Sequence, residues 1–236
     1  MSSEAPTAAD YFGSMAESYD SLVRRAIPRY DEMITRLVEY LPSRAERILE
    51  LGCGTGNLTL GLCRRYPGAE LVFVDASPEM VAFTRRRLSG QDGGFAERAV
   101  PWVARFEELD HRAGRFDLVV SSISMHHVRE KQGLYRAVFA LLEPGGTFRW
   151  SDQLAGATDE IHQRTWEGWL AFCRQPGNCT EQEIASLLEH ARAHDHYEPL
   201  EEHFRMLGAA GFAPVDCTWR NSMWAVVTAE RPPEPR

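Results

Sequence analysis

Residues 48–57 read ILELGCGTGN, an apolar run that ends in a glycine-rich turn. Glycines let the backbone approach a bound cofactor closely and adopt φ/ψ values that other residues avoid. Asp75 ends the next apolar run, Leu71–Val74, which places it at the tip of the neighbouring strand. A strand, glycine loop, helix and second strand with such a distal Asp form a nucleoside-binding half-site. In that half-site the Asp accepts hydrogen bonds from ribose hydroxyls.

The spacing of the glycines indicates which cofactor binds. The dinucleotide fingerprint is G-x-G-x-x-G and directs helix amides at a pyrophosphate. Here the glycines are Gly52, Gly54 and Gly56, and Asn57 occupies the place of the third dinucleotide glycine. With Glu50 before the loop, the segment resembles the class I S-adenosylmethionine-dependent methyltransferases, whose loop reads E/D-x-G-x-G-x-G. The alternative is a glycine turn that merely packs a helix onto a strand.

Length and composition agree with one α/β domain. The chain has 236 residues, 44% of them hydrophobic and 25% charged, as in ordinary globular proteins. No apolar run approaches about 18 residues and no secretory signal opens the chain, so we expect no membrane partner. The five cysteines form no C-x-x-C pair, which favours the cytoplasm. The net charge of −8 disfavours a nucleic-acid partner, which requires a basic surface.

Apolar periodicity predicts that helices and strands alternate. The expected strands are residues 48–51, 71–74, 102–104, 116–120 and 147–151, and the expected helices include 28–41, 58–66, 78–88, 181–193 and 199–210. Residues 213–228 read as a β-hairpin that closes the sheet edge. This order predicts a doubly wound parallel sheet that binds ligands beyond the carboxyl ends of its strands. The resemblance implies seven strands, mostly parallel, with an antiparallel C-terminal strand and a helical cover over the active site.

The same patterns divide the chain into one domain with two tails. We expect disordered ends over residues 1–10 and 230–236 and a single methyltransferase domain over residues 11–229. Within that domain, the expected parts are a helical cap (11–44), a cofactor-binding core (45–152), a helical cover (153–211) and the C-terminal hairpin (212–229).

The resemblance also implies a set of cofactor-binding residues. Glu50 should order the loop, Asp75 should hold the ribose, and Ser121 should face the sulfonium end. The family often has an acid after the third strand, but Arg105 and Phe106 stand there, and Glu107 and Glu108 come too late in the chain. Tyr19 is either a cofactor neighbour or an aromatic core anchor. The full set is Tyr19, Glu50, Gly52, Cys53, Gly54, Gly56, Asp75, Ala76, Met80, Phe106 and Ser121.

Two residues near the strand ends are candidate catalytic groups. His126 follows the fourth strand, and a histidine can take a proton near neutral pH. Asp152 ends the fifth strand and is a candidate base or substrate contact. The alternatives are a histidine that packs on or caps the next helix, which applies to His127 as well, and a carboxylate that caps a helix.

Other histidines and the tryptophans have ordinary explanations. A cluster of histidines in the C-terminal half resembles a metal site, but the charged residues around it favour a solvated helix face, and we expect no metal. These histidines are His190, His194, His196 and His203. Aromatic residues at helix or strand spacing usually belong to the core, although some should line an acceptor pocket. The tryptophans considered are Trp150, Trp166, Trp169, Trp219 and Trp224.

The resulting hypothesis is methyl transfer from S-adenosyl-L-methionine to a small molecule by in-line displacement, with S-adenosyl-L-homocysteine as product. The alternatives are a nicotinamide-dependent oxidoreductase, a tRNA-modifying methyltransferase and a cofactor-binding module without transfer activity. No D/N-P-P-Y motif follows the fourth strand, where residues 121–124 read SSIS, so methylation of a nucleobase or glutamine nitrogen is disfavoured. The acceptor atom and a homodimer stay open.

Overall fold

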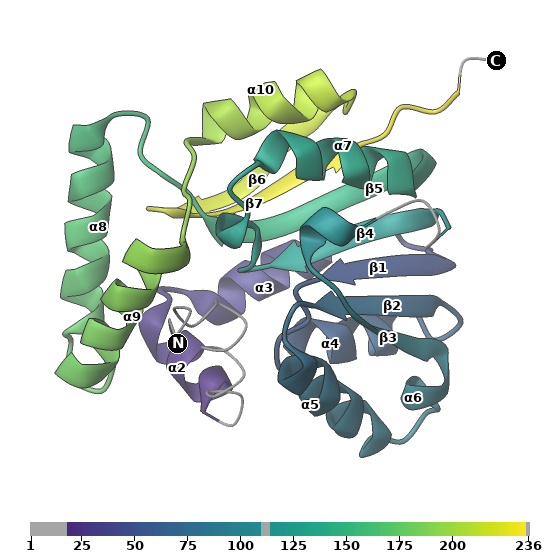
Figure 1. The fold of residues 1–236 in the computed structure, drawn as a ribbon, viewed down its shortest axis with the longest axis horizontal. Helices are drawn as coiled ribbons and strands as arrows, with labels where there is room; N and C mark the ends of the chain where they lie inside the picture. Colours follow the sequence, from purple (N-terminus) through teal and green to yellow (C-terminus); the bar gives the residue numbers. More distant parts are fainter. Residues whose placement is uncertain (1–17, 110–113, 235–236) are drawn as a thin grey trace, which may run out of the picture.

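The computed structural model describes residues 18–109 and 114–234. One seven-stranded sheet has the order β3-β2-β1-β4-β5-β7-β6 (Figure 1). β1 to β5 run parallel, and β7 pairs antiparallel with both β5 and β6. The strands are β1 (Arg47–Leu51), β2 (Glu70–Asp75), β3 (Ala99–Val103), β4 (Phe116–Ser122), β5 (Leu142–Gln153), β6 (Val215–Asn221) and β7 (Trp224–Glu230). The predicted fold class is confirmed.

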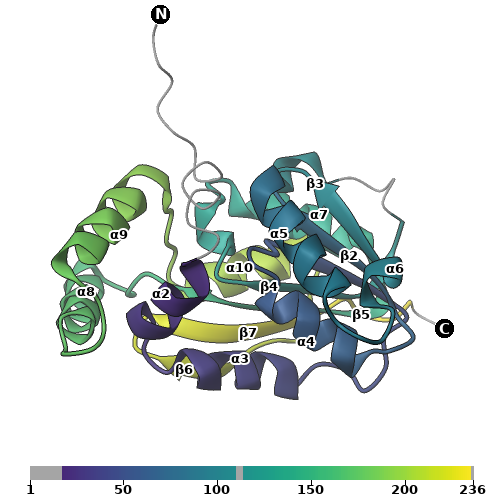
Figure 2. The ribbon, with the colours of Figure 1, turned by 90° about the horizontal axis from the view of Figure 1, so that it is seen from below.

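Helices cover both faces of this sheet. α7 and α10 pack on one face, and α3 and α4 pack on the other (Figure 2). α8 and α9 extend to the side of the sheet, next to α2. The helices are α2 (Tyr19–Ala26), α3 (Tyr30–Glu39), α4 (Asn57–Arg65), α5 (Pro78–Ser89), α6 (Phe95–Arg98), α7 (Lys131–Leu141), α8 (Asp159–Cys173), α9 (Glu181–His194) and α10 (Leu200–Ala210), with 3₁₀ turns η1 (Phe106–Glu108) and η3 (Met125–His127).

The continuous apolar run of β4 reflects burial on both sides of the sheet. Leu118 and Val120 join the core beneath α3 and α4, whereas Phe116 and Val119 join the core beneath α7 and α10. All four side chains are fully buried. Because successive residues of a strand point to opposite faces, a strand covered on both faces needs apolar residues at successive positions.

Several predicted ends are confirmed by their caps. The Ser77 hydroxyl accepts a hydrogen bond from the Met80 amide at the start of α5. Thr180 and Glu183 form the predicted capping box of α9. These contacts satisfy amides that a helix start leaves without an intrahelical partner.

Several boundaries differ from the prediction, including those of β5, β3 and the C-terminal tail. β5 begins at Leu142 rather than residue 147 and continues to Gln153, so Asp152 lies inside the strand, opposite Ala225 of β7. β3 begins at Ala99 rather than residue 102. The C-terminal tail was expected from residue 230, but Glu230 ends β7 and Arg231 exchanges backbone hydrogen bonds with residues 145 and 146. The expected N-terminal tail, residues 1–10, lies outside the described residues.

The described helices include none long and apolar enough to cross a membrane.

Candidate active site

The loop after β1 depends on glycine at two positions. Gly52, Gly54 and Gly56 have φ values of +73°, +51° and +80°. A Cβ on Gly52 would lie 2.3 Å from Ser124 Oγ, and one on Gly56 would lie 2.9 Å from Thr84 Oγ1. At Gly54 a Cβ would meet nothing within 4 Å. The positive φ values and the close neighbours therefore exclude larger residues at Gly52 and Gly56.

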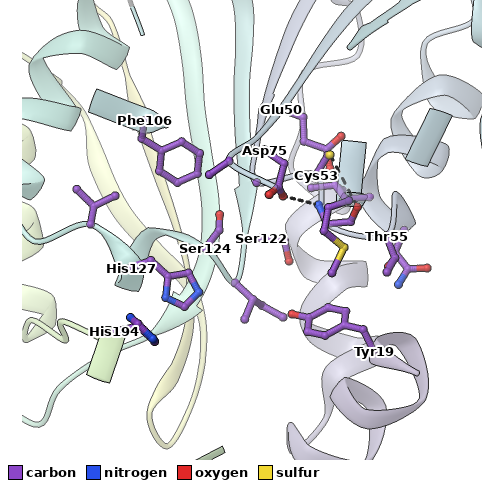
Figure 3. Close-up of a pocket in the computed structure, with 18 of the residues that line it drawn as sticks. Tyr19, Glu50, Cys53, Thr55, Asp75, Phe106, Ser122, Ser124, His127 and His194 are labelled. Carbon is purple, nitrogen blue, oxygen red and sulfur yellow. Dashed lines mark hydrogen bonds between the residues drawn. The ribbon is translucent and has the colours of Figure 1, made fainter. Parts of the chain in front are cut away.

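Asp75, at the end of β2, holds the loop in place. One carboxylate oxygen of Asp75, which Figure 3 shows beside the loop, accepts a hydrogen bond from the Gly54 amide at 2.9 Å. The other oxygen accepts one from the Ser77 amide at 2.9 Å. Burial raises the pKa of Asp75, and these amides oppose the rise. Burial raises the pKa of Glu50 to about 8, so that carboxyl is largely protonated at neutral pH.

A cavity of about 430 Å³ opens over this loop, within the usual size range of ligand pockets. Figure 3 shows His127 and His194 across the cavity from the glycine loop. The predicted cofactor residues that line the cavity are Tyr19, Glu50, Gly52, Cys53, Gly54, Asp75, Ala76, Met80 and Phe106. The structure thus brings together most of the predicted set.

Two predicted residues, Gly56 and Ser121, do not line the cavity. Gly56 packs against Thr84 behind the loop. The Ser121 hydroxyl is fully buried, where it donates to Leu51 O at 2.9 Å and lies 2.8 Å from Ser124 Oγ. Its neighbours Ser122 and Ser124 line the cavity instead.

A second cavity of about 80 Å³ adjoins the first, because Tyr19 and Ile123 line both. Its wall is mostly apolar and includes Trp169 and Trp224. Its polar residues are His126, Gln153, Asp195 and Tyr197. The smaller cavity therefore has an apolar wall and a cluster of four polar residues, His126, Gln153, Asp195 and Tyr197, and it lies beside the larger cavity.

The predicted catalytic residues meet in this polar cluster. His126 Nδ1 lies 2.5 Å from Asp152 Oδ1, and the His126 amide donates to Asp152 Oδ2 at 2.9 Å. Burial alone would lower the pKa of His126, but the Asp152 charge and hydrogen bond raise it overall. The same pairing, with a hydrogen bond from the Gln153 amide, lowers the pKa of Asp152 despite its burial.

Asp195, just beyond α9, lies close to three imidazoles, those of His126, His127 and His190. Its Oδ1 lies 3.1 Å from His127 Nδ1, 3.6 Å from His190 Nε2 and 3.7 Å from His126 Nε2. Tyr197 donates its hydroxyl proton to the other oxygen, Oδ2. The neighbouring imidazoles and this hydroxyl hold the pKa of Asp195 far below its usual range, although burial opposes them. Burial lowers the pKa values of His127 and His190 to about 4.

The C-terminal histidines are not the solvated face that the sequence predicts. His190 and His203 are only 7% and 2% exposed. His203 Nδ1 lies 2.5 Å from the Tyr135 hydroxyl, beneath α10. His194 and His196 line the larger cavity.

The sequence of this chain is similar to known methyltransferase sequences. Residues 49–148 match a family described as "Methyltransferase domain". The chain is 35% identical over 153 residues to a malonyl-[acyl-carrier protein] O-methyltransferase of Magnetococcus marinus, covering 63% of this chain and 50% of the relative. It is 29% identical over 208 residues to a carboxy-S-adenosyl-L-methionine synthase of Yersinia pestis, covering 84% of this chain and 75% of that protein. Over residues 49–148 this chain therefore carries a methyltransferase domain, in agreement with its resemblance to the class I S-adenosylmethionine-dependent methyltransferases.

Solved structures agree on the fold. A phosphoethanolamine N-methyltransferase 2 of Haemonchus contortus, in complex with phosphomonomethylethanolamine and S-adenosylhomocysteine, superposes with a TM-score of 0.67. The likeness covers 93% of this chain and 58% of that one at 14% identity, so it shows the fold alone. This methyltransferase chain spans about half the length of the first curated relative.

Sequence reasoning missed several residues that line the methyltransferase's larger cavity. Glu107 was placed too late in the chain, but the turn η1 brings it to the cavity beside Arg105. His127 was given an ordinary packing role and also lines the cavity. His194 and His196 come from the end of α9, so no local pattern connects them with the glycine loop.

Proposed function

We propose that this protein transfers the methyl group of S-adenosylmethionine to a small-molecule acceptor. The observation that carries the proposal is the pair of adjoining cavities. The larger one has the glycine loop and Asp75 on one side, where a nucleoside would lie, and the smaller one is lined by His126, whose ring contacts Asp152 behind the cavity wall. Tyr19 and Ile123 line both cavities, so a methyl group near these residues would be within reach of both.

Within this arrangement Asp75, the glycine loop and two apolar side chains would each contact a different part of the cofactor. Asp75 uses one lone pair of each carboxylate oxygen for a backbone amide, so further lone pairs can accept from ribose hydroxyls. The glycine loop offers backbone without side chains to the methionine part of the cofactor. Phe106 and Met80 provide apolar surface for the adenine.

The reaction is an in-line displacement. A lone pair of the acceptor atom forms the new bond to the methyl carbon while the carbon–sulfur bond breaks, and the sulfur keeps that electron pair. The products are S-adenosylhomocysteine and the methylated acceptor, with one proton released when the acceptor is a hydroxyl or thiol and none when it is an ionised carboxylate. Most of the rate enhancement comes from holding the reacting atoms about 3 Å apart and aligned.

His126 and Asp152 are the proposed catalytic pair at the acceptor end. Asp152 makes two hydrogen-bonding contacts to His126, one at the ring and one at the amide, which fix the ring within its pocket. Nδ1 is used in the first contact, so Nε2 is the ring atom that can act on the acceptor.

A small acceptor with an apolar part fits the second cavity. Its volume of about 80 Å³ is far below the space that a nucleic acid or a folded protein partner would need. The chain's net charge of −8 also opposes an RNA substrate. The carrier-protein relative is described as an O-methyltransferase, and an acyl group carried on such a protein is one acceptor to include in a screen.

The test has two steps. Calorimetric titration with S-adenosylhomocysteine measures cofactor binding by the wild type, by Asp75→Ala, and by the exposed control Asp92→Ala. Mass spectrometry then follows S-adenosylhomocysteine production from S-adenosylmethionine across a panel of small hydroxylated, thiol and carboxylate compounds. We expect tight binding by the wild type and the control, weak binding by Asp75→Ala, and turnover with a member of the panel. Failure of the wild type to bind would overturn the proposal.

A further inference from the structure

Three side chains that normally bind transition metals converge between the two cavities. They are His126 and His127 of the turn η3 and Asp195 beyond α9, and one ligand atom of each lies within 4.8 Å of the other two. The atoms are His126 Nε2, His127 Nδ1 and Asp195 Oδ1. All three side chains are largely buried, with exposures of 7%, 19% and 6%.

The separations agree with tetrahedral coordination. Zinc binds imidazole nitrogen and carboxylate oxygen at about 2.0 to 2.2 Å, so two ligand atoms in a tetrahedron lie about 3.3 Å apart. Asp195 Oδ1 lies 3.1 Å from His127 Nδ1 and 3.7 Å from His126 Nε2. An ion between them would need only small side-chain shifts.

The outer contacts match those of known metal ligands. A metal-binding histidine almost always directs its second ring nitrogen to a carboxylate or carbonyl, which fixes the ring. Here His126 Nδ1 is held by Asp152 Oδ1 at 2.5 Å, which leaves Nε2 on the side of Asp195. Tyr197 likewise binds Asp195 Oδ2 and leaves Oδ1 for the ion. These contacts orient the ligand atoms toward one point.

We infer that His126, His127 and Asp195 bind a divalent transition metal, with zinc as the best match, and that the metal holds an oxygen or sulfur atom of the methyl acceptor. Three protein ligands leave a fourth position open, as in catalytic zinc sites. His127 lines the larger cavity, and His126 and Asp195 line the smaller one, so that position lies between the two proposed binding sites. His190, whose Nε2 is 3.6 Å from Asp195 Oδ1, stands beside the site.

This inference adds a metal ion to the proposed methyl transfer. The part that assigns an acceptor to the metal rests on the proposed function. A hydroxyl or thiol bound to the metal loses its proton to water more readily, and the lone pair it keeps attacks the methyl carbon. His126 then acts on the acceptor through the metal, and Asp152 is a positioning residue. The acceptor class is therefore a small, partly apolar molecule whose reacting oxygen or sulfur can bind the metal, such as a hydroxyl, a thiol or a carboxylate.

Metal binding is measured without reference to methyl transfer. The protein is stripped with a chelator, dialysed, and titrated with Co²⁺, whose visible absorption bands report tetrahedral coordination; Zn²⁺ should then displace it. We expect about one ion per chain in the wild type. His127→Ala and Asp195→Asn should abolish the bands, and Asp152→Asn should weaken binding about 10- to 100-fold.

The matched control is His194→Ala, which removes a histidine one helical turn beyond His190 and outside the ligand set. It should keep the Co²⁺ spectrum of the wild type. Circular dichroism checks that each variant is folded. If the folded wild type binds no Co²⁺ or Zn²⁺, or if the ligand variants bind them as well as the wild type, the metal site is wrong and the cluster is an ion-pair network of protein groups alone.

The two proposals fail in different ways. If the wild type does not bind S-adenosylhomocysteine, the methyl transfer proposal is contradicted. Metal binding measured with Co²⁺ would still support the metal site. Absence of metal with normal S-adenosylhomocysteine binding contradicts only the metal site.

Discussion

The Asp75 carboxylate accepts a hydrogen bond from the Gly54 amide at 2.9 Å, so the end of β2 holds the glycine loop in its bent conformation. The second oxygen binds the Ser77 amide, which begins the path into α5. One carboxylate therefore connects the two segments that surround the proposed ribose site. Its removal should affect both the shape of the loop and the cofactor contact.

We expect Asp75→Ala to weaken S-adenosylhomocysteine binding roughly 10- to 100-fold, because hydrogen bonds to a charged group contribute about 1.5 to 3 kcal/mol. Asp75→Asn keeps one acceptor oxygen and should fall between the wild type and Asp75→Ala. Isothermal titration calorimetry at constant ionic strength measures both. Equal affinities for Asp75→Ala and the wild type would show that the carboxylate is not a cofactor contact.

Gly52 and Gly54 both have a positive φ but differ in how close their neighbours lie, so their alanine variants can be compared directly. Gly54→Ala places a Cβ in open space and costs mainly the positive φ of +51°, about 1 to 2 kcal/mol. Gly52→Ala has the same kind of backbone cost at φ +73° and also puts its Cβ 2.5 Å from Ser124 Cβ. Urea denaturation should therefore show a clearly larger loss of unfolding free energy for Gly52→Ala. Equal losses would mean that Ser124 moves aside freely.

The cofactor half of the site could be predicted because its signals are local. The glycine loop and Asp75 lie at the ends of consecutive strands, and the parallel order brings strand ends together at one edge. Ser121 shows the limit of this reasoning. Side chains alternate between the faces of a strand, so an error of one position exchanges the buried hydroxyl of Ser121 for Ser122, which lines the cavity.

His126 and Asp152 could be predicted from their places at strand ends, but the contacts of Asp195 with His127 and His190 could not, because tertiary packing creates them. Glu189 and Arg192 give α9 a polar sequence around His190, yet η3 packs against that helix and His190 is buried. Asp195 comes nearly 70 residues after His126, and no spacing rule connects them. Burial and ion pairing in this cluster arise only when the helical cover meets the end of β4.

An ion pair between the N-terminal helix and the cover gives a pH prediction. Arg25 of α2 binds Glu183 of α9 through two contacts of 2.6 and 3.0 Å, which lowers the pKa of Glu183 to about 2. A folded-state pKa below the unfolded value of 4.5 stabilises the fold above pH 4.5, and this contribution disappears as the pH falls through 2. Both side chains are about 30% exposed, so we expect less than about 1 kcal/mol.

Glu183→Gln isolates this contribution, because glutamine still serves the capping box. Thermal melts of the wild type and the variant should differ by a constant amount above about pH 5 and converge between pH 4.5 and pH 2. Arg25→Ala should show the same convergence. A difference that grows on acidification would contradict the ion-pair interpretation.

The His126 and Asp152 pair should behave as one unit in methyl transfer. Asp152→Asn removes the negative charge from the 2.5 Å contact and His126→Ala removes the contact itself, and we expect either to lower kcat about 100-fold with the acceptor found in the screen. Neither residue lines the larger cavity, so S-adenosylhomocysteine affinity should change less than about twofold. The double variant should be no slower than the slower single variant, since the effects of residues that act together are not additive.

Removing one member of a buried ion pair can cost about 3 to 5 kcal/mol of stability, so the assays are run at a temperature where circular dichroism shows all three variants folded. Additive losses in kcat, or a large loss of cofactor affinity, would assign the two residues separate roles.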